Sequence, residues 1–126
     1  MIHVIIPTFN RLNYTIICLN SLKKQVNFKE LNIIVVDDAS TDGTKEFIKK
    51  KFPKITILRG TGFLFWGGAV HRGVDYALKI GKPKDWILLV NNDVELSSDA
   101  ISNLIRISKK KKKESISRIF NYKRWR

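Results

Sequence analysis

A cluster of two amides and an acid follows one of the apolar runs in the sequence. Residues 86–90 (WILLV) lead directly into Asn91, Asn92 and Asp93. Carboxylate and amide oxygens are the hard ligands that Mg²⁺ and Mn²⁺ prefer, and an ion held by one or two of them usually completes its shell with substrate phosphates. The cluster therefore indicates a divalent cation beside a diphosphate. The alternative is an Asx turn that leads to a helix cap at Ser97.

The turn after the first apolar run, PTFNR (7–11), also carries groups suited to ligand binding. Thr8 and Asn10 offer hydrogen bonds, and the proline stiffens the turn. Phe9 offers a flat face and Arg11 a cation for an anion. The alternative is an ordinary strand-to-helix turn in which Asn10 or Asn13 only caps the helix.

Two adjacent acids, Asp37 and Asp38, end the second apolar run. Two neighbouring carboxylates can both be ionised at low cost only where at least one of them is solvated or paired with a cation. Successive strand residues point to opposite sides, so one acid faces a ligand crevice while the other anchors a loop. A carboxylate in that crevice accepts a hydrogen bond from an N–H group of a nucleobase.

The glycine-rich segment 60–68 (GTGFLFWGG) matches neither of the two common phosphate-binding motifs. No glycine is followed by Lys-Ser or Lys-Thr, so a Walker A loop is absent. Gly60 and Gly62 follow the third apolar run instead of the first, and the spacing of a dinucleotide turn fails as well. Within this segment, packing is the favoured interpretation of Trp66, over a platform for a sugar.

The order of elements places all these groups at one edge of a sheet. Four short runs are almost continuously apolar, which is typical of parallel strands covered on both faces. They alternate with segments of helical periodicity, and right-handed crossovers between them give a three-layer, open, mostly parallel α/β sheet. Ligands bind such sheets outside the carboxyl ends of the strands. The expected strands are 3–7, 32–37, 55–59 and 86–91, and the expected helices are 14–26, 44–52, 69–80 and 98–109.

The chain of 126 residues is long enough for one domain, and 44% of its residues are hydrophobic. Of the formal net charge of +13, residues 109–126 contribute +8, from nine Lys or Arg and one Glu. We expect this segment to be a solvated basic tail. The alternative is an anion-binding module in which the tail docks on a membrane surface or nucleic acid and the α/β core is a scaffold.

The single cysteine and the N-terminal residues indicate in which cellular compartment to expect the protein. Cys18 is the single cysteine and forms no internal disulfide, which favours a reducing compartment, and we interpret it as a core thiol. The start, MIHVIIPTFN, lacks the features of a signal peptide, and no stretch approaches the length of a membrane span. We expect a cytoplasmic protein, with weak contact to the inner membrane face through the basic tail.

Taken in order, four motifs resemble the family 2 glycosyltransferases of the GT-A fold, and rhamnosyltransferase-like members in particular. The motifs are VIIPTFNR, IIVVDDASTDGT, GFLFWGGAVHRGVDYAL and ILLVNNDVEL, and the resemblance covers about residues 2–108. It implies transfer of a sugar from a UDP, GDP or dTDP donor to a hydroxyl of a saccharide or lipid-linked acceptor, as in polysaccharide biosynthesis. It also implies inversion at the sugar and the use of Mn²⁺ or Mg²⁺.

Carried onto this sequence, the resemblance implies specific roles. Asp38 corresponds to the acid that reads the base, Asp93 to the metal ligand, and Asn91 takes the place of a second acid in the metal motif, which weakens metal affinity. Gly67 and Gly68 would let the backbone approach the donor, and Arg72 would add positive charge there, whereas His71 is equally well a surface or helix-packing residue. The nucleotide-binding residues are then Pro7, Thr8, Phe9, Arg11, Asp38, Gly67, Gly68, Arg72 and Asn92.

The resemblance also implies that a part is missing. In this family the catalytic base lies well beyond the metal motif, whereas here the sequence becomes lysine-rich after Ser108 and ends at Arg126. We therefore expect an incomplete nucleotide-sugar-binding domain over 1–108, as in a truncated or frameshifted gene or a fragment. The base is not identified, and Glu95 is not assigned to that role. A sugar-1-phosphate nucleotidylyltransferase would need a glycine-rich loop after the first strand, which PTFNR does not provide.

Overall fold

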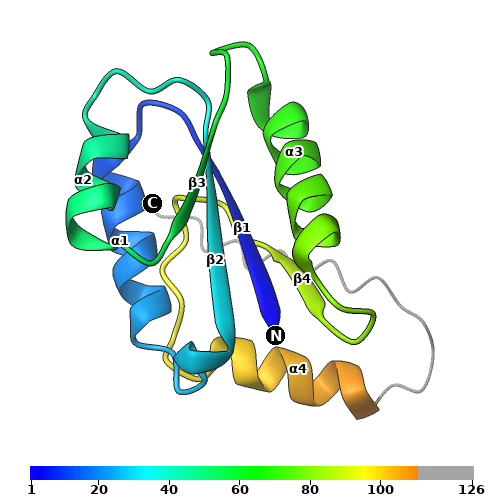
Figure 1. The fold of residues 1–126 in the computed structure, drawn as a ribbon. Coiled ribbons are helices and arrows are strands. Elements are labelled where there is room, and N and C mark those ends of the chain that lie inside the picture. Colours follow the sequence, from blue (N-terminus) through cyan, green and yellow to red (C-terminus); the bar gives the residue numbers. More distant parts are fainter. Residues whose placement is uncertain (111–126) are drawn as a thin grey trace.

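The computed structural model of the protein describes residues 1–110, which form one parallel sheet with helices on both faces (Figure 1). The strand order is β3-β2-β1-β4, and all the strand pairs are parallel, which confirms the expected α/β sheet. The strands are β1 (Ile2–Thr8), β2 (Leu31–Asp37), β3 (Thr56–Arg59) and β4 (Trp86–Leu89). The helices are α1 (Leu12–Lys23), α2 (Thr44–Lys51), α3 (Phe65–Ile80), α4 (Ala100–Lys110) and a short 3-10 turn, η1 (Phe28–Glu30).

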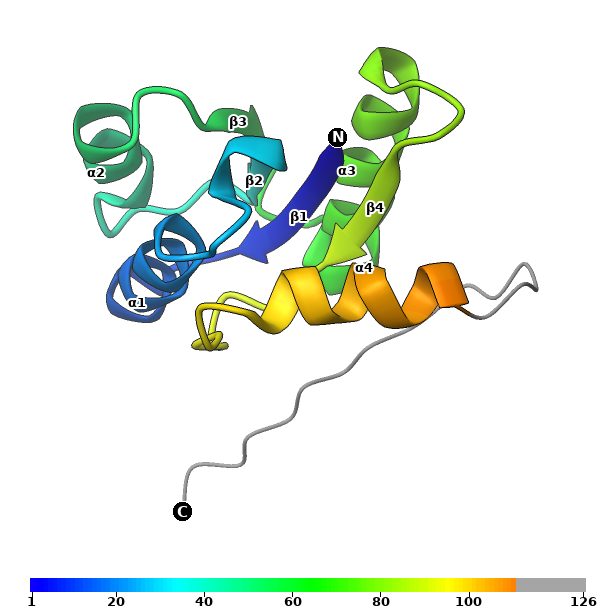
Figure 2. The ribbon, with the colours of Figure 1, turned by 90° about the horizontal axis from the view of Figure 1, so that it is seen from below.

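Successive side chains of the strands point to opposite faces of the sheet and form a separate hydrophobic core on each face. Val4, Ile6 and Val35 pack on the face covered by α1, α2 and α4, whereas Ile5 and Ile34 pack under α3. Figure 2 shows these helices on the two sides of the sheet. Because both faces are covered, the strands are apolar at nearly every position, which is the pattern seen in the sequence.

Pro7 explains why β4 leaves the sheet where it does. The β1–β4 ladder pairs Ile5 with Leu89, and the N–H of Val90 donates to the carbonyl of Ile5 at 3.0 Å. The next backbone position of β1 that faces β4 is Pro7, which has no N–H to donate. The chain after Val90 therefore separates from β1, and the polar cluster 91–93 lies at the end of the sheet.

Two helices begin earlier than the sequence pattern indicates. α1 begins at Leu12 instead of residue 14, and α3 begins at Phe65, four residues before the expected start. The first turn of α3 contains Gly67 and Gly68, which are poor helix formers. The sequence pattern therefore did not predict this turn as helix. The two glycines therefore lie in the first turn of the helix, whereas the sequence placed them before it.

A distant side chain fixes the start of α4. The Oε1 atom of Gln25 accepts from the N–H of Ile101 at 3.1 Å, and its Nε2 atom donates to the carbonyl of Ser97 at 2.6 Å. The Ser97 hydroxyl bonds to Asp99 instead of capping the helix in the expected way. Gln25 thus ties the segment after the metal motif to the end of α1, and it is buried.

At the opposite edge of the sheet, Asp85 organises a buried histidine. Asn32 donates to Nδ1 of His3 at 3.0 Å, which leaves Nε2 of His3 to donate to Asp85 at 3.1 Å. The N–H of Lys82 and the amino group of Met1 also bond to Asp85, and in that order these groups lower the pKa of Asp85 to about 2.

We expect Asp85→Asn to destabilise the protein at neutral pH and progressively less in acid. A carboxyl whose pKa is lowered by folding adds stability above its unfolded pKa of about 4 and loses that stability as the pH falls toward about 2. Urea denaturation of both proteins at several pH values measures this, and the difference should narrow between about pH 4 and about pH 2. A difference that is constant with pH would contradict the assigned pKa.

Within residues 1–110, no helix has both the length and the hydrophobicity needed to cross a membrane. Lys109 and Lys110 end α4, and the rest of the basic segment expected as a tail, 111–126, lies outside the described residues. Its contact with a membrane surface therefore remains a prediction.

Candidate functional site

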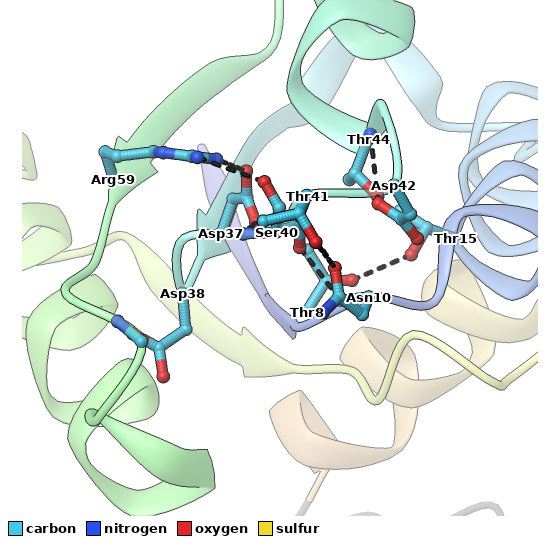
Figure 3. Close-up of polar contacts among 11 residues, drawn as sticks. Thr8, Asn10, Thr15, Asp37, Asp38, Ser40, Thr41, Asp42, Thr44 and Arg59 are labelled. Carbon is cyan, nitrogen blue, oxygen red and sulfur yellow. Dashed lines mark hydrogen bonds and ion pairs between the residues drawn. The ribbon is translucent and has the colours of Figure 1, made fainter.

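The turns that follow β1, β2, β3 and β4 meet at the carboxyl edge of the sheet, as expected for parallel strands. Hydrogen bonds join the first two of these turns (Figure 3). The N–H of Asn10 donates to Oγ of Ser40 at 2.9 Å, and Oδ1 of Asn10 accepts from the N–H of Thr41 at 2.7 Å. Asp42 accepts from the N–H of Leu12 at 2.9 Å. The edge is therefore pre-organised by its own polar groups.

Asp37 is the acid that anchors a loop. It is fully buried, pairs with the guanidinium of Arg59 and accepts from the N–H of Ser40 at 3.0 Å. Arg59 also donates to the carbonyl of Ser40 at 3.1 Å. One of the two adjacent acids is thus paired, and it holds the β2–α2 turn against the end of β3.

Asp38 faces the other way, toward the loop between β3 and α3. Its Oδ1 atom accepts from the N–H of Gly62 at 2.7 Å, and Oδ2 accepts from the N–H groups of Leu64 and Phe65 at 2.9 and 3.2 Å. Figure 3 shows the Asp38 side chain turned toward this loop and away from Asp37. The carboxylate thus occupies the position of an anion at the start of α3, where N–H groups lack helical partners.

The glycines of this loop are required by the close approach of Asp38. A Cβ on Gly60 would lie 2.3 Å from Oδ1 and 2.9 Å from Cα of Asp38, and Gly62 has a φ of +92°. Phe65 also has a positive φ, of 53°, which is rare for an aromatic residue. Three hydrogen bonds to one carboxylate hold this unfavourable backbone in place.

Trp66 links the start of α3 to Asn91, the first residue of the expected metal motif. Its indole N–H donates to Oδ1 of Asn91 at 3.0 Å, although the two residues are 25 positions apart in the sequence. The preceding residue, Phe65, donates its N–H to Asp38. Two consecutive residues therefore bond to the groups after β2 and after β4, so Asp38 and Asn91 border one site.

Asn92 lies in a buried network beneath this site. Its Nδ2 atom donates to Oγ1 of Thr8 at 3.1 Å and to Oγ1 of Thr15 at 3.2 Å, and the two threonine hydroxyls are 2.9 Å apart. Thr15 donates its own hydrogen to the carbonyl of Arg11 at 2.8 Å, so Thr8 donates to Thr15. Both Thr8 and Asn92 are buried. The network positions the loops, and a direct contact of either residue with a nucleotide remains a prediction.

We expect Asn92→Asp to lower the free energy of unfolding by about 2–3 kcal/mol, because a carboxylate oxygen would replace a buried amide that donates two hydrogen bonds. The neighbouring change Asn91→Asp is the matched control. It keeps an acceptor for the Trp66 indole at an exposed position, and we expect a change within about 0.5 kcal/mol. Urea denaturation measures both, and equal effects of the two changes would contradict the network.

Asp93 offers a solvent-exposed carboxylate for a metal ion. Its side chain is 49% exposed, and the guanidinium of Arg11 is 3.9 Å from it. Within residues 1–110, no group of three or more His, Cys, Asp or Glu residues forms a metal site. One acid with a neighbouring amide fits Mg²⁺ or Mn²⁺ whose shell is completed by phosphates, and it does not fit a site built from protein ligands alone.

The remaining expected site residues fall into buried and exposed groups. Pro7 is buried in β1, whereas Phe9 is 52% exposed, and Arg11 lies 5.8 Å from the ring centre of Tyr14. An open depression of about 340 Å³ is lined by residues 10–14 and Asp42. It flanks the expected nucleotide turn.

Near the start of α3, Gly67 has open space around its Cα, and Gly68 packs against Leu64. Arg72 is exposed, and the neighbouring His71 pairs with Asp75 on the helix surface at 3.2 Å. Contacts of Gly67, Gly68 and Arg72 with a donor remain predictions, as they do for Pro7, Phe9 and Arg11.

Cys18 lies beneath the metal motif, and its Sγ atom is 3.7 Å from the carbonyl oxygen of Asn91. Burial, and then the charge of Asp93, raise the pKa of this thiol to about 12. A buried thiol with so high a pKa is unreactive, as expected for a core residue.

Several residues that shape the site carry no recognisable signal in the sequence. Arg59, Gln25 and Trp66 each bond to a partner at least 22 residues away. Gly60 is the exception, since a glycine directly after a strand is a signal of close backbone approach.

Comparison with known proteins identifies the family. Residues 3–123 match the family model described as glycosyl transferase family 2, and this match extends into the basic segment 109–126. An uncharacterized glycosyltransferase of Mycoplasma genitalium is 29% identical over 94% of this chain and 40% of the relative. The poly(ribitol-phosphate) beta-glucosyltransferase of Bacillus spizizenii is 33% identical over 86% of this chain and 17% of the relative. The chain thus spans less than half of the length of these relatives.

Solved structures agree with the fold. The crystal structure of residues 1–349 of Staphylococcus aureus TarS matches with a TM-score of 0.69 and 27% identity, over 86% of this chain and 32% of that one. The same protein in complex with UDP-GlcNAc matches with a TM-score of 0.64 and 26% identity, over 86% of this chain and 31% of that one. The expected GT-A fold is thereby confirmed. The motifs lie in the expected order on this fold, and the family model matches residues 3–123 of the 126 in the chain, so the chain belongs to glycosyl transferase family 2.

Proposed function

We propose that the carboxyl edge of the sheet binds a nucleoside diphosphate sugar together with Mn²⁺ or Mg²⁺. The observation that carries this proposal is the pair of bonds from consecutive residues, Phe65 to Asp38 and Trp66 to Asn91. These bonds bring the acid expected to read a base and the motif expected to hold a metal to one site. The similarity to a structure that contains UDP-GlcNAc supports UDP as the nucleotide.

The donor lies with its base at Asp38 and its diphosphate at Asp93. Asp38 already accepts three hydrogen bonds, but an ionised carboxylate offers about four lone-pair sites, and Oδ1 accepts only one N–H. Oδ1 therefore retains capacity for an N–H of a base. Uracil, thymine and guanine present a ring N–H at their pairing edge, whereas cytosine has an unprotonated ring nitrogen there and donates only from its exocyclic amino group.

A cation at Asp93 supplies charge neutralisation for the departing diphosphate. Arg11, which is 3.9 Å from Asp93, adds a second positive charge on the same side of the site. With a single acid and an amide in the motif, we infer weak metal binding in the absence of nucleotide and tighter binding with it. The transfer step also needs a base that takes the proton of the acceptor hydroxyl, and residues 1–110 supply no group that we assign to this role.

The acceptor, inversion at the sugar and contact with a membrane belong to the activity of a complete enzyme. This chain spans 40% and 17% of the two relatives described above, so we propose donor binding as its own activity and transfer as the activity of the family. A saccharide or a lipid-linked saccharide is the acceptor that the family implies. No specific role in binding nucleic acid is proposed.

Calorimetric titration with UDP, GDP, dTDP and CDP, each with Mn²⁺, tests the proposal. We expect UDP to bind and CDP to bind at least tenfold more weakly. The ring nitrogen of cytosine has no hydrogen for Asp38, and its amino group lies at a different position from the ring N–H of uracil. The full chain and a chain without residues 111–126 should bind UDP equally. Equal affinity for all four nucleotides, or loss of binding with the basic segment, would contradict a base-reading site at the edge of the sheet.

A further inference from the structure

Trp66 differs from the two exposed phenylalanines of the same segment, Phe63 and Phe65, because a hydrogen bond fixes its ring in place. Phe63 and Phe65 are 79% and 75% exposed, and their rings make no hydrogen bond. Trp66 is 52% exposed, and its indole N–H is bonded to Asn91. The exposure departs from the packing role that its sequence context favours.

The backbone of Trp66 is fixed as firmly as its ring. The two residues before it, Leu64 and Phe65, donate their N–H groups to the buried carboxylate of Asp38. The helix then begins, with the N–H of Gly68 bonded to the carbonyl of Leu64 at 3.0 Å. A half-exposed aromatic ring held at both its backbone and its ring nitrogen presents a fixed surface, which loses little entropy when a ligand binds to it.

The orientation of the donor in the proposed site brings its sugar near the ring of Trp66. On the proposed function, the base lies at Asp38 after β2 and the diphosphate at Asp93 after β4, with β1 between these strands. The sugar follows the diphosphate, so it lies at the β4 end of the site. Asn91, two residues before Asp93, holds Trp66 at this end.

We propose that Trp66 contacts the sugar of the donor and that Asn91 is the residue that positions it. The face of an indole ring is apolar and electron-rich, and it suits the C–H groups of a pyranose. Asn91 then acts through its bond to Trp66, from whose indole N–H it accepts. This inference rests on the proposed function and adds the sugar-contacting residue to it.

The test compares UDP with UDP-glucose and UDP-GlcNAc, because the difference in affinity isolates the sugar. We expect the wild-type chain to bind one of the two sugar nucleotides more tightly than UDP. Trp66→Ala should weaken binding of that sugar nucleotide by about 5- to 10-fold and leave the affinity for UDP unchanged. Trp66→Phe, which keeps a ring without the N–H, should give an intermediate loss.

Asn91→Ala and Phe63→Ala complete the set. Asn91→Ala should reduce the preference for the sugar nucleotide as Trp66→Phe does, since both remove the same hydrogen bond. Phe63→Ala removes an aromatic ring of the same segment that bonds to nothing, and it should change neither affinity.

A spectroscopic measurement does not depend on the stability of these variants. In a Trp86→Phe, Trp125→Phe chain, Trp66 is the only tryptophan, and its emission should change with the sugar nucleotide and not with UDP. The inference is overturned if UDP binds while Trp66→Ala leaves the preference for the sugar unchanged, or if the wild-type chain has no such preference. Absence of any UDP binding would instead overturn the proposed function and this inference with it.

Discussion

Asp38→Ala is expected to remove UDP binding and to lower the free energy of unfolding by about 2–4 kcal/mol. The carboxylate accepts from three backbone N–H groups, of Gly62, Leu64 and Phe65, and alanine leaves all three without this partner. The positive φ of Phe65 also loses the bonds that hold it. One change then removes the acid that we propose reads the base and the bonds that hold the loop before Trp66.

Urea denaturation and calorimetry with UDP and Mn²⁺ measure the two effects separately. Asp75→Ala is the matched control, because Asp75 is exposed on α3 and pairs with His71 on the same helix. This control should change the stability by less than about 0.5 kcal/mol and leave UDP binding intact. If Asp38→Ala kept the stability of the parent, the hydrogen bonds to the loop would not have the importance assigned to them.

Gly73→Ala is expected to destabilise the protein by about 1–3 kcal/mol, although alanine favours helix more than glycine does. The new methyl group would lie 2.4 Å from Cγ2 of Ile5 and 3.1 Å from Cγ2 of Val36, both of which are fully buried. α3 therefore approaches the sheet closely at Gly73. Pushing α3 away would also displace Trp66 from Asn91.

Gly67→Ala tests the same substitution in the same helix without the clash. Within residues 1–110, a Cβ at Gly67 would have no atom within 4 Å apart from its chain neighbours and the backbone of its own helix. The free energy of unfolding should therefore stay equal or rise by up to about 1 kcal/mol. Thermal and urea denaturation of both variants give the comparison. Similar destabilisation by the two changes would show that propensity, and not packing against Ile5 and Val36, determines the effect.

The sheet was predictable because its physical signal is local. Each strand is apolar at consecutive positions, and each is followed within a few residues by polar groups, as at Asp38 and Asn91. Parallel strands alternating with helices leave few topologies, and all of these bring the carboxyl ends together. The order of the elements therefore predicted that Asp38 and Asp93 lie at the same edge of the sheet.

The contacts inside the site were not predictable, because they join segments that are far apart in sequence. Asp38 bonds to N–H groups 24 to 27 residues away, and Asn92 bonds to threonines 77 and 84 residues away. Nothing in the local sequence distinguishes Asn92, which supports the loops, from Asn91, which holds Trp66. The start of α3 was missed for a different reason, since Gly67 and Gly68 have low helix propensity.

Nuclear magnetic resonance with Mn²⁺ tests the central claim most directly, because the ion broadens the signals of nearby amides. In the presence of UDP, we expect broadening of amides in residues 8–11, 61–66 and 91–93, at the carboxyl edge of the sheet. Signals from Lys82 to Trp86, at the opposite edge, should stay sharp, and Asp93→Asn should abolish the broadening. Broadening at that opposite edge, or broadening unchanged in Asp93→Asn, would contradict a metal-assisted nucleotide site at the ends of β1, β2 and β4.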